Sequence, residues 1–183
     1  MINWINIAFY QITWLAAIAG AARGWWWAGP VMLAIFAIWQ LTVSRQRRAD
    51  VELMLSAAAV GFVVDSACVQ SGMLVYAAAV PSAQFAPIWI IALWMSFALT
   101  LNHSLAYLKS NLLLAAVLGA TGAPLAYWAA ARGWGALAFA ARPEAALGTL
   151  AVAWAILAPC LCLLARHLVR ENGTQPALRG ASR

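Results

Sequence analysis

One carboxyl group stands inside an apolar stretch of this sequence. Asp65 lies in Gly61-Phe-Val-Val-Asp65-Ser-Ala-Cys68, within a span from Glu52 to Gly72. A carboxylate surrounded by hydrocarbon is costly unless it is paired, hydrated or protonated, and such acids rarely face lipid. Small residues three or four positions away let helices approach closely, so this face is expected to point into a helical bundle. Two roles stay open: a functional group, or a structural one that bonds a neighbouring helix or pairs with Arg23 or Arg132.

A second set of polar residues follows with helical spacing. Steps of four, three and four place them on one face of a helix, with Asn102 beside them. Histidine is the side chain whose unperturbed pKa lies near neutrality, which makes His103 a candidate proton carrier or acid–base group; the alternative is a histidine that only hydrogen-bonds its neighbours. The stripe consists of Ser96, Thr100, His103 and Tyr107.

The next apolar stretch contains Pro124, preceded by Gly122 and followed by Tyr127. A proline inside a span removes a backbone hydrogen bond and kinks the helix, a feature that recurs at transporter sites and also in ordinary bundles. At about 1.5 Å per residue, Asp65 is expected roughly 20 Å and His103 roughly 9 Å from the cytoplasmic helix ends. The two residues are therefore not expected to form a pair.

The sequence contains no phosphate-binding loop, no closely spaced histidines and no lysine within an apolar span, so we expect no metal and no cofactor. Most of the eleven tryptophans fit belts at the two membrane interfaces. The four that are expected to line any pocket are Trp14, Trp89, Trp94 and Trp154.

Composition excludes a soluble globular domain. The 183 residues are 66% hydrophobic and 9% charged, against about 25% charged residues in soluble domains. The net charge of +6 does not indicate nucleic-acid binding, because the basic residues stand at the ends of apolar segments, where they meet lipid headgroups. The three cysteines show no metal or disulfide spacing.

The apolar segments predict an all-α, polytopic membrane protein with a six-helix transmembrane bundle in residues 1–170 and a disordered cytoplasmic tail in 171–183. Basic residues favour the cytoplasmic side, which places both termini in the cytoplasm, with eight Lys and Arg inside and three outside. The expected helices are 4–22, 25–43, 52–70, 87–108, 110–131 and 144–168.

Three segments together resemble a known family. They are Gly61-x-x-x-Asp65-x6-Gly72, the stretch from Pro87 through Asn102-His103-Ser104-Leu105, and Gly119-Ala-Thr-Gly122-Ala-Pro124-Leu-Ala-Tyr127. The chain is similar, from Trp4 to about Arg170, to a family of small bacterial inner-membrane proteins catalogued as domain of unknown function 2878. Ala123 stands where that family is expected to have a second glycine. The resemblance implies an inner-membrane location and a role near lipid or envelope metabolism, and it assigns no catalytic residue.

Three functions remain open from the sequence. The first is a small carrier or accessory factor for a lipid-like or other small substrate, with Asp65 and His103 as proton-linked or polar contacts. The second is a membrane-embedded enzyme that modifies acyl chains, with His103 at the wall of a pocket open to lipid. The third is a structural subunit of a membrane complex. The expected partners are membrane lipids, with a membrane-protein partner or a second copy of the chain possible. The candidate polar interior comprises Asp65, Ser96, Thr100, Asn102, His103, Tyr107, Pro124 and Tyr127.

Overall fold

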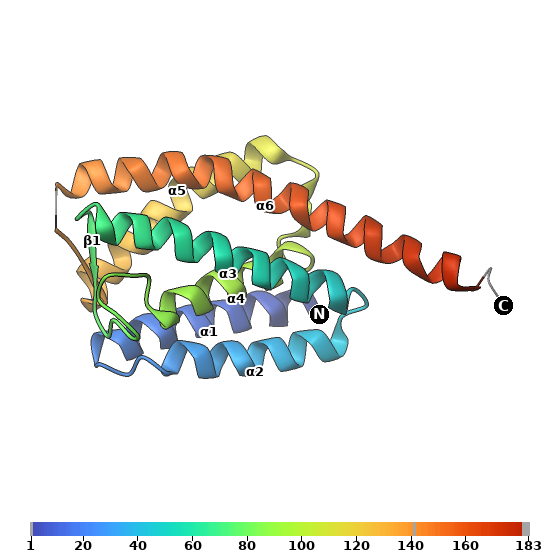
Figure 1. Ribbon diagram of the computed structural model, residues 1–183, viewed down its shortest axis with the longest axis horizontal. Helices are drawn as coiled ribbons and strands as arrows, with labels where there is room; N and C mark the ends of the chain where they lie inside the picture. The colour runs from blue at the N-terminus through green and yellow to red at the C-terminus, as the bar shows by residue number, and fades with distance from the viewer. Residues whose placement is uncertain (1, 141, 181–183) are drawn as a thin grey trace.

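The computed structural model describes the backbone of residues 2–140 and 142–180, and the side chains of residues 2–140 and 142–172. Within these residues the chain forms six α-helices that lie side by side in one bundle (Figure 1). The predicted all-α fold is confirmed. The helices are α1 (Ile2–Ala22), α2 (Ala28–Val43), α3 (Arg47–Gln70), α4 (Ile88–Leu101), α5 (Leu112–Ala129) and α6 (Pro143–Gly180).

Four helices are long and apolar enough to cross a membrane: α1, α3, α5 with its continuation to Trp134, and α6 as far as Asn172. The other two are apolar but shorter, with 16 residues in α2 and 14 in α4. At about 1.5 Å per residue they cover roughly 24 and 21 Å of a hydrocarbon core about 30 Å thick. These two helices are too short to span such a core by themselves.

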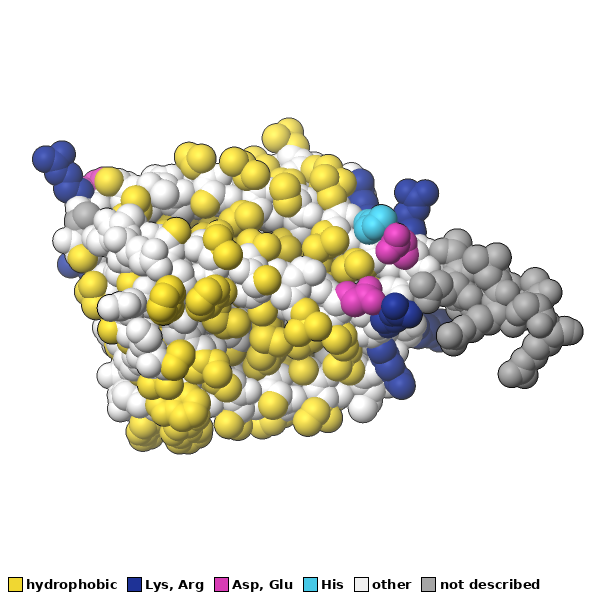
Figure 2. Space-filling view, viewed as in Figure 1, with side chains coloured by type: hydrophobic (Ala, Val, Ile, Leu, Met, Phe, Trp, Pro, Cys, Tyr) yellow, Lys and Arg dark blue, Asp and Glu magenta, His cyan; other side chains and the backbone are white. Residues whose placement is uncertain are grey.

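The outer surface of the bundle is apolar along the middle and charged at its ends. Figure 2 shows hydrophobic side chains across the whole central part of one face, with the dark blue and magenta side chains gathered at the two extremities. Val63 on α3 and Val152 on α6 are each 65% exposed. An apolar surface of this extent would be a liability in water, so it indicates contact with lipid.

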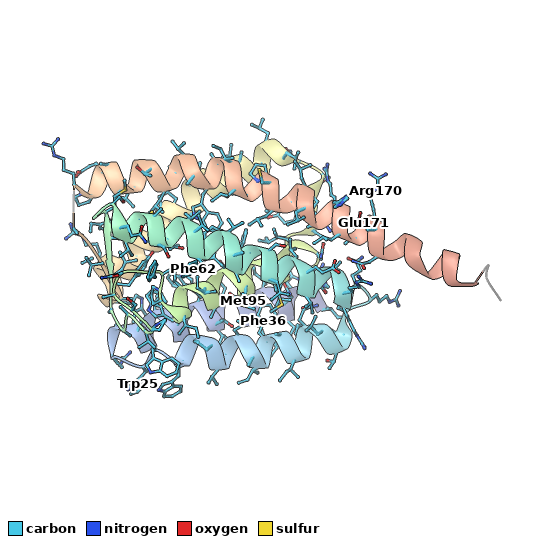
Figure 3. The ribbon with its side chains drawn as sticks, in the orientation of Figure 1. Trp25, Phe36, Phe62, Met95, Arg170 and Glu171 are labelled. Carbon is cyan, nitrogen blue, oxygen red and sulfur yellow. The ribbon has the colours of Figure 1, made fainter. Side chains whose placement is uncertain are left out.

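The two ends of the bundle differ. One end, the strand end, carries β1 (Leu74–Tyr76) and β2 (Leu137–Phe139), which pair antiparallel with Tyr76 opposite Leu137. The other, the basic end, carries the α2–α3 turn with Arg45, and both the start of α1 and the end of α6 lie there (Figure 1). In Figure 3 the labelled Trp25 lies at the strand end and Arg170 lies at the basic end.

Several boundaries differ from those predicted. Helix α3 begins at Arg47 instead of Glu52, so that Asp50 lies in its first turn. Helix α4 ends at Leu101 instead of 108, and a short 3-10 helix, η1 (Ala106–Lys109), follows. The chain leaves the helix here because the backbone N–H groups of His103 and Leu105 both donate to Thr100, which turns residues 102 and 103 back towards α3.

The predicted disordered tail also differs. Helix α6 continues past Leu168 to Gly180, and residues 181–183 lie outside the described part of the chain. Asn172 anchors the continuation, because its amide donates to Glu52 on α3 at 3.1 Å and to the Leu168 carbonyl at 2.9 Å. The segment between α5 and α6, which the expected helices leave unassigned, continues α5 as a π-helical turn, η2 (Ala130–Trp134), and then forms β2.

Candidate functional site

Asp65 lies at the centre of a buried hydrogen-bonded cluster near the strand end. Its side chain is 0% exposed. The hydroxyls of Tyr76 and Tyr127 donate to Oδ1 at 2.5 and 2.6 Å, and the indole N–H of Trp94 donates to Oδ2 at 2.6 Å. Among the described residues no cation bonds to this carboxyl group. Three neutral donors from three other elements therefore hold it in the interior.

Separate parts of the fold position these donors. Pairing with β2 fixes Tyr76, whose neighbour in the strand, Val75, points outwards. Burial, followed by the nearby Asp65 charge, raises the pKa of Tyr76 well above its ordinary value, so its phenol stays protonated and can donate. Trp94 lies directly over Gly61, where a Cβ would stand 2.3 Å from its ring. Gly61, four positions before Asp65, thus leaves room for the Trp94 indole that donates to Asp65.

The cluster is not the one the sequence predicts. Neither Arg23 nor Arg132 pairs with Asp65 in the described residues: Arg23 donates to the Ala19 carbonyl, and no ion pair involves Arg132. Tyr76 was missed because it lies in an uncharged stretch between helices, whose three-residue strand is too short to give a clear pattern. Tyr127 and Trp94 were each named, but the sequence does not show that they meet Asp65.

The predicted polar stripe on the fourth helix divides into three parts. Ser96 and Thr100 are fully buried, but their hydroxyls donate to carbonyls of their own helix, Leu93 at 2.9 Å and Phe97 at 2.6 Å. They are satisfied locally and offer no site. Tyr107, on η1, is 51% exposed and lies away from the interior, because α4 ends before it.

Asn102 and His103 belong to a second cluster, around Asp50 at the basic end. The Asp50 side chain is 0% exposed. Its Oδ1 accepts from the Asn102 amide at 2.9 Å, and its Oδ2 accepts from the Ser44 hydroxyl at 2.6 Å and lies 3.0 Å from His103 Nε2. The Lys109 ammonium donates to Asn102 Oδ1 at 2.8 Å. Asp50 thus ties the α2–α3 turn to the end of α4.

Asp50 was missed because it stands among arginines in a stretch that looks solvated. The only signal in the sequence for a buried Asp50 was its position within one helical turn of the start of an apolar span. A neighbouring set of amides extends the cluster to α1: Asn6 donates to Gln40 at 2.6 Å and to the Leu99 carbonyl at 3.1 Å, and it accepts from Ser104. The prediction that Asp65 and His103 do not pair agrees with this geometry, since each has its own partners.

An apolar cavity of about 510 Å³ lies between α1, α4, α5 and α6. This is within the range of about 300–1,000 Å³ typical of small-molecule sites. All four tryptophans predicted to line a pocket line it: Trp14, Trp89, Trp94 and Trp154. The rings of Trp94 and Trp154 stack with centroids 4.4 Å apart.

The cavity opens sideways, towards the surface of α5. Its lining residues Leu118 and Leu125 are 42% and 64% exposed, and Gln11 on α1 is also exposed. The opening therefore lies in a largely apolar part of the surface. Pro124 does not line the cavity, but Gly122 and Ala123 before it do.

Asp65 lies behind the wall of this cavity. It does not line the space itself, whereas its donors Trp94 and Tyr127 do. The polar groups of both rings are hydrogen-bonded to the carboxyl group, so the rings present their apolar faces to the cavity. His103 is also absent from the lining among the described residues. The site can therefore hold an apolar molecule. Among the described residues, the titratable groups that line it are the phenols of Tyr10 and Tyr127.

No group of three or more His, Cys, Asp and Glu side chains within the described ranges is arranged to hold a metal ion. The three cysteines are free thiols. The site is thus defined by its aromatic wall and by the hydrogen bonds behind that wall.

Fold and site together define a helical membrane protein with an apolar cavity inside its bundle. The family described as Protein of unknown function (DUF2878) matches residues 3–160, and the chain belongs to this family. This confirms the resemblance found in the sequence. Comparison with curated proteins and with solved structures gives no significant match.

Proposed function

We propose that this protein binds the apolar chain of a lipid-like molecule in the aromatic cavity, as a small carrier or accessory factor of envelope or lipid metabolism. The observation that carries the proposal is the cavity itself: about 510 Å³, lined by four tryptophans and open towards lipid. Aromatic side chains bury large apolar areas at little conformational cost, which suits binding of a flexible chain. The sideways opening supports entry from the bilayer.

Asp65 acts in this proposal as a positioning residue. Its contacts with Trp94 and Tyr127 fix two rings of the cavity wall, and it does not reach the bound molecule. The acid–base group expected for an enzyme that modifies acyl chains, His103, does not line the cavity and is held by Asp50 at 3.0 Å. These contacts favour binding over catalysis.

Filling the cavity tests the proposal. A Cβ at Gly122 meets no atom within 4 Å, so the side chain of Gly122→Phe begins in open space and places a ring at the cavity mouth. We expect this variant to fold normally and to lose at least about tenfold in affinity for a photoactivatable long-chain alcohol, because the ring takes the space of the chain. Crosslinking yield against probe concentration, in purified protein, measures the loss.

Gly148→Phe is the matched control. Gly148 is exposed on α6, lies outside the cavity lining and also has no atom within 4 Å of a built Cβ. It should bind the probe like the unchanged protein. Equal crosslinking of both variants, or no crosslinking of the unchanged protein, would show that the cavity does not bind such chains.

The proposal also includes the bacterial inner membrane, with the basic end in the cytoplasm. The support is the excess of Lys and Arg at that end, which is typical of cytoplasmic loops. Single cysteines at Ser82, between β1 and α4, and at Gln46, in the α2–α3 turn, test this in a background with the native cysteines replaced by alanine. We expect a membrane-impermeant maleimide to label Cys at 82 in intact spheroplasts and Cys at 46 only after lysis. The reverse pattern would invert the orientation.

A further inference from the structure

Part of the polar surface of the cavity wall is used by the fold itself. The indole N–H of Trp89 donates to the Ala77 carbonyl at 3.0 Å. Trp94 and Tyr127 donate to Asp65, each at 2.6 Å. These three side chains line the cavity from α4 and α5, and none of them has a hydrogen-bond donor left for a bound molecule.

Helix α1 differs from these walls, because its polar groups are unbonded. Tyr10, Trp14 and Ile18 follow one another at steps of four on one face of α1 and line the cavity. Gln11 lies beside this face and lines the cavity as well. The side chains of Tyr10, Gln11 and Trp14, here called the α1 donors, form no hydrogen bond with another described residue. The Tyr10 hydroxyl and the Trp14 N–H are accessible, unlike the unbonded nitrogen of Trp154, which is buried.

Gln11 is an exposed amide in an apolar surface. It lies near the midpoint of α1, a helix long and apolar enough to cross a membrane, and at the mouth of the cavity. An amide in such surroundings is unfavourable unless it forms hydrogen bonds. Within the part of the chain that the structure describes, Gln11 has no such partner. A partner from outside the chain is therefore expected, and the cavity is the place for it.

The lining also indicates which kind of partner fits. Within the described residues, no Asp, Glu, Lys, Arg or His side chain lines the cavity, so a charged group there would have no counter-ion. The indole N–H of Trp14 can only donate, and the Tyr10 hydroxyl and the Gln11 amide can donate as well. A carbonyl oxygen only accepts, and its two lone pairs can take two donors. The wall therefore favours an uncharged molecule with a carbonyl group.

We infer that the cavity takes an uncharged lipid that carries a carbonyl group, an acyl ester or a prenylated quinone, whose carbonyl oxygen accepts from the α1 donors and whose hydrocarbon lies among the tryptophans. This rests on the proposed function and names the class of its ligand. The polar and aromatic walls are in contact: Tyr10 packs on Phe97 with ring centroids 6.3 Å apart, and Phe97 packs on Trp154 at 5.4 Å. One molecule can thus touch both.

Ligands that differ in one group test the inference. Purified protein is titrated with the methyl ester, the methyl ether and the carboxylate of one long chain, each competing with the photoactivatable alcohol. The ester and the ether differ in the carbonyl oxygen alone, and we expect the ester to bind about tenfold more tightly through two neutral hydrogen bonds. The carboxylate should bind more weakly than the ether, because no cation lines the described part of the cavity.

A prenylated quinone is the second arm of the experiment, since it also carries carbonyl oxygens on an apolar chain. Tighter binding of the quinone than of the ester assigns the ligand to the quinones, and the reverse order assigns it to the acyl esters. Both orders support the inference, provided that the ester binds more tightly than the ether.

The double variant Tyr10→Phe/Gln11→Leu removes two of the α1 donors and keeps the Tyr10 ring. We expect its affinity for the ester to fall to within about threefold of that for the ether, while ether binding is unchanged and shows that the variant is folded. A hydrogen-bonded carbonyl absorbs at lower infrared frequency than a free one, so the band of an isotope-labelled ester carbonyl should move to higher frequency in this variant. The control is Tyr107→Phe/Gln70→Leu, at two exposed residues outside the lining, which should keep the preference.

Equal binding of ester and ether by the unchanged protein, or a preference that survives the double variant, overturns the inference while the proposed function stands. A carboxylate that binds more tightly than the ester overturns it too. If Gln11→Leu turns a dimer into a monomer and leaves the ester preference unchanged, the amide serves a contact between two copies, and the inference is overturned as well. Failure of alcohol, ether and ester alike to bind contradicts the proposed function instead.

Discussion

Asp65→Ala is expected to lower the free energy of unfolding by about 3–5 kcal/mol, because it leaves three buried donors without an acceptor, each worth about 1–3 kcal/mol. The donors are the hydroxyls of Tyr76 and Tyr127 and the indole N–H of Trp94, all within 2.6 Å of the carboxyl group. The tyrosine hydroxyls can rotate towards each other, which keeps the total below the simple sum. Thermal unfolding of the purified protein in detergent, followed by circular dichroism, measures the change.

Two variants separate loss of the acceptor from loss of packing. Asp65→Asn keeps the shape of the side chain and one acceptor oxygen. This oxygen can accept from Trp94 while the amide donates to a rotated tyrosine hydroxyl. Asp65→Asn should therefore lower the free energy of unfolding less than Asp65→Ala. Tyr76→Phe removes one donor and should cost about 1 kcal/mol. If Asp65→Ala melts like the unchanged protein, the carboxyl group does not hold the interior together. A role in proton transport would then explain the buried acid better.

The expected effect on binding distinguishes positioning from direct contact. Because Asp65 reaches the cavity only through Trp94 and Tyr127, Asp65→Asn should loosen these two rings and weaken binding of the photoactivatable alcohol without abolishing it. A complete loss of binding with unchanged melting would instead indicate that Asp65 contacts the ligand.

Gly61→Ala is expected to cause the second largest loss in the free energy of unfolding, about 2–3 kcal/mol or more. A Cβ at this position would lie 2.3, 2.4 and 2.6 Å from three atoms of the Trp94 ring, which is far inside normal contact. The ring cannot yield easily, because it is 2% exposed, stacks on Trp154 and donates to Asp65 at 2.6 Å. Overpacking of this kind typically costs about 1–3 kcal/mol, and here it also displaces a hydrogen bond.

The matched control is Gly148→Ala, on the exposed face of α6, where an added Cβ meets no atom within 4 Å. In a helix interior this change should be neutral or stabilising by about 0.5–1 kcal/mol. Melting curves of the two variants, together with the fluorescence of the displaced tryptophan, provide the measurement. Equal stability of both variants would mean that α3 and α4 do not approach as closely as the structure shows.

The sequence determined the apolar helices, the charged ends and the inward-facing side of α3 around Asp65. These properties are local, because hydrophobicity, charge and helical spacing are read over one or two turns of a helix. The same holds for the tryptophans of the cavity: Trp14, Trp94 and Trp154 stand inside their helices, away from the belts, whereas Trp89 stands at the start of α4. The family resemblance is likewise a property of sequence, and it is confirmed by the match over residues 3–160.

Only the tertiary structure decided which polar groups meet. Tyr127 stands 62 residues from Asp65, and His103 stands 53 residues from Asp50. Helical spacing placed His103 on a stripe with Thr100, but a helix that ends at Leu101 turns it towards α3. Tyr76 reaches Asp65 because a three-residue strand pairs with a segment more than sixty residues away. Such contacts depend on how whole helices pack and where they end, and no short stretch of sequence carries that information.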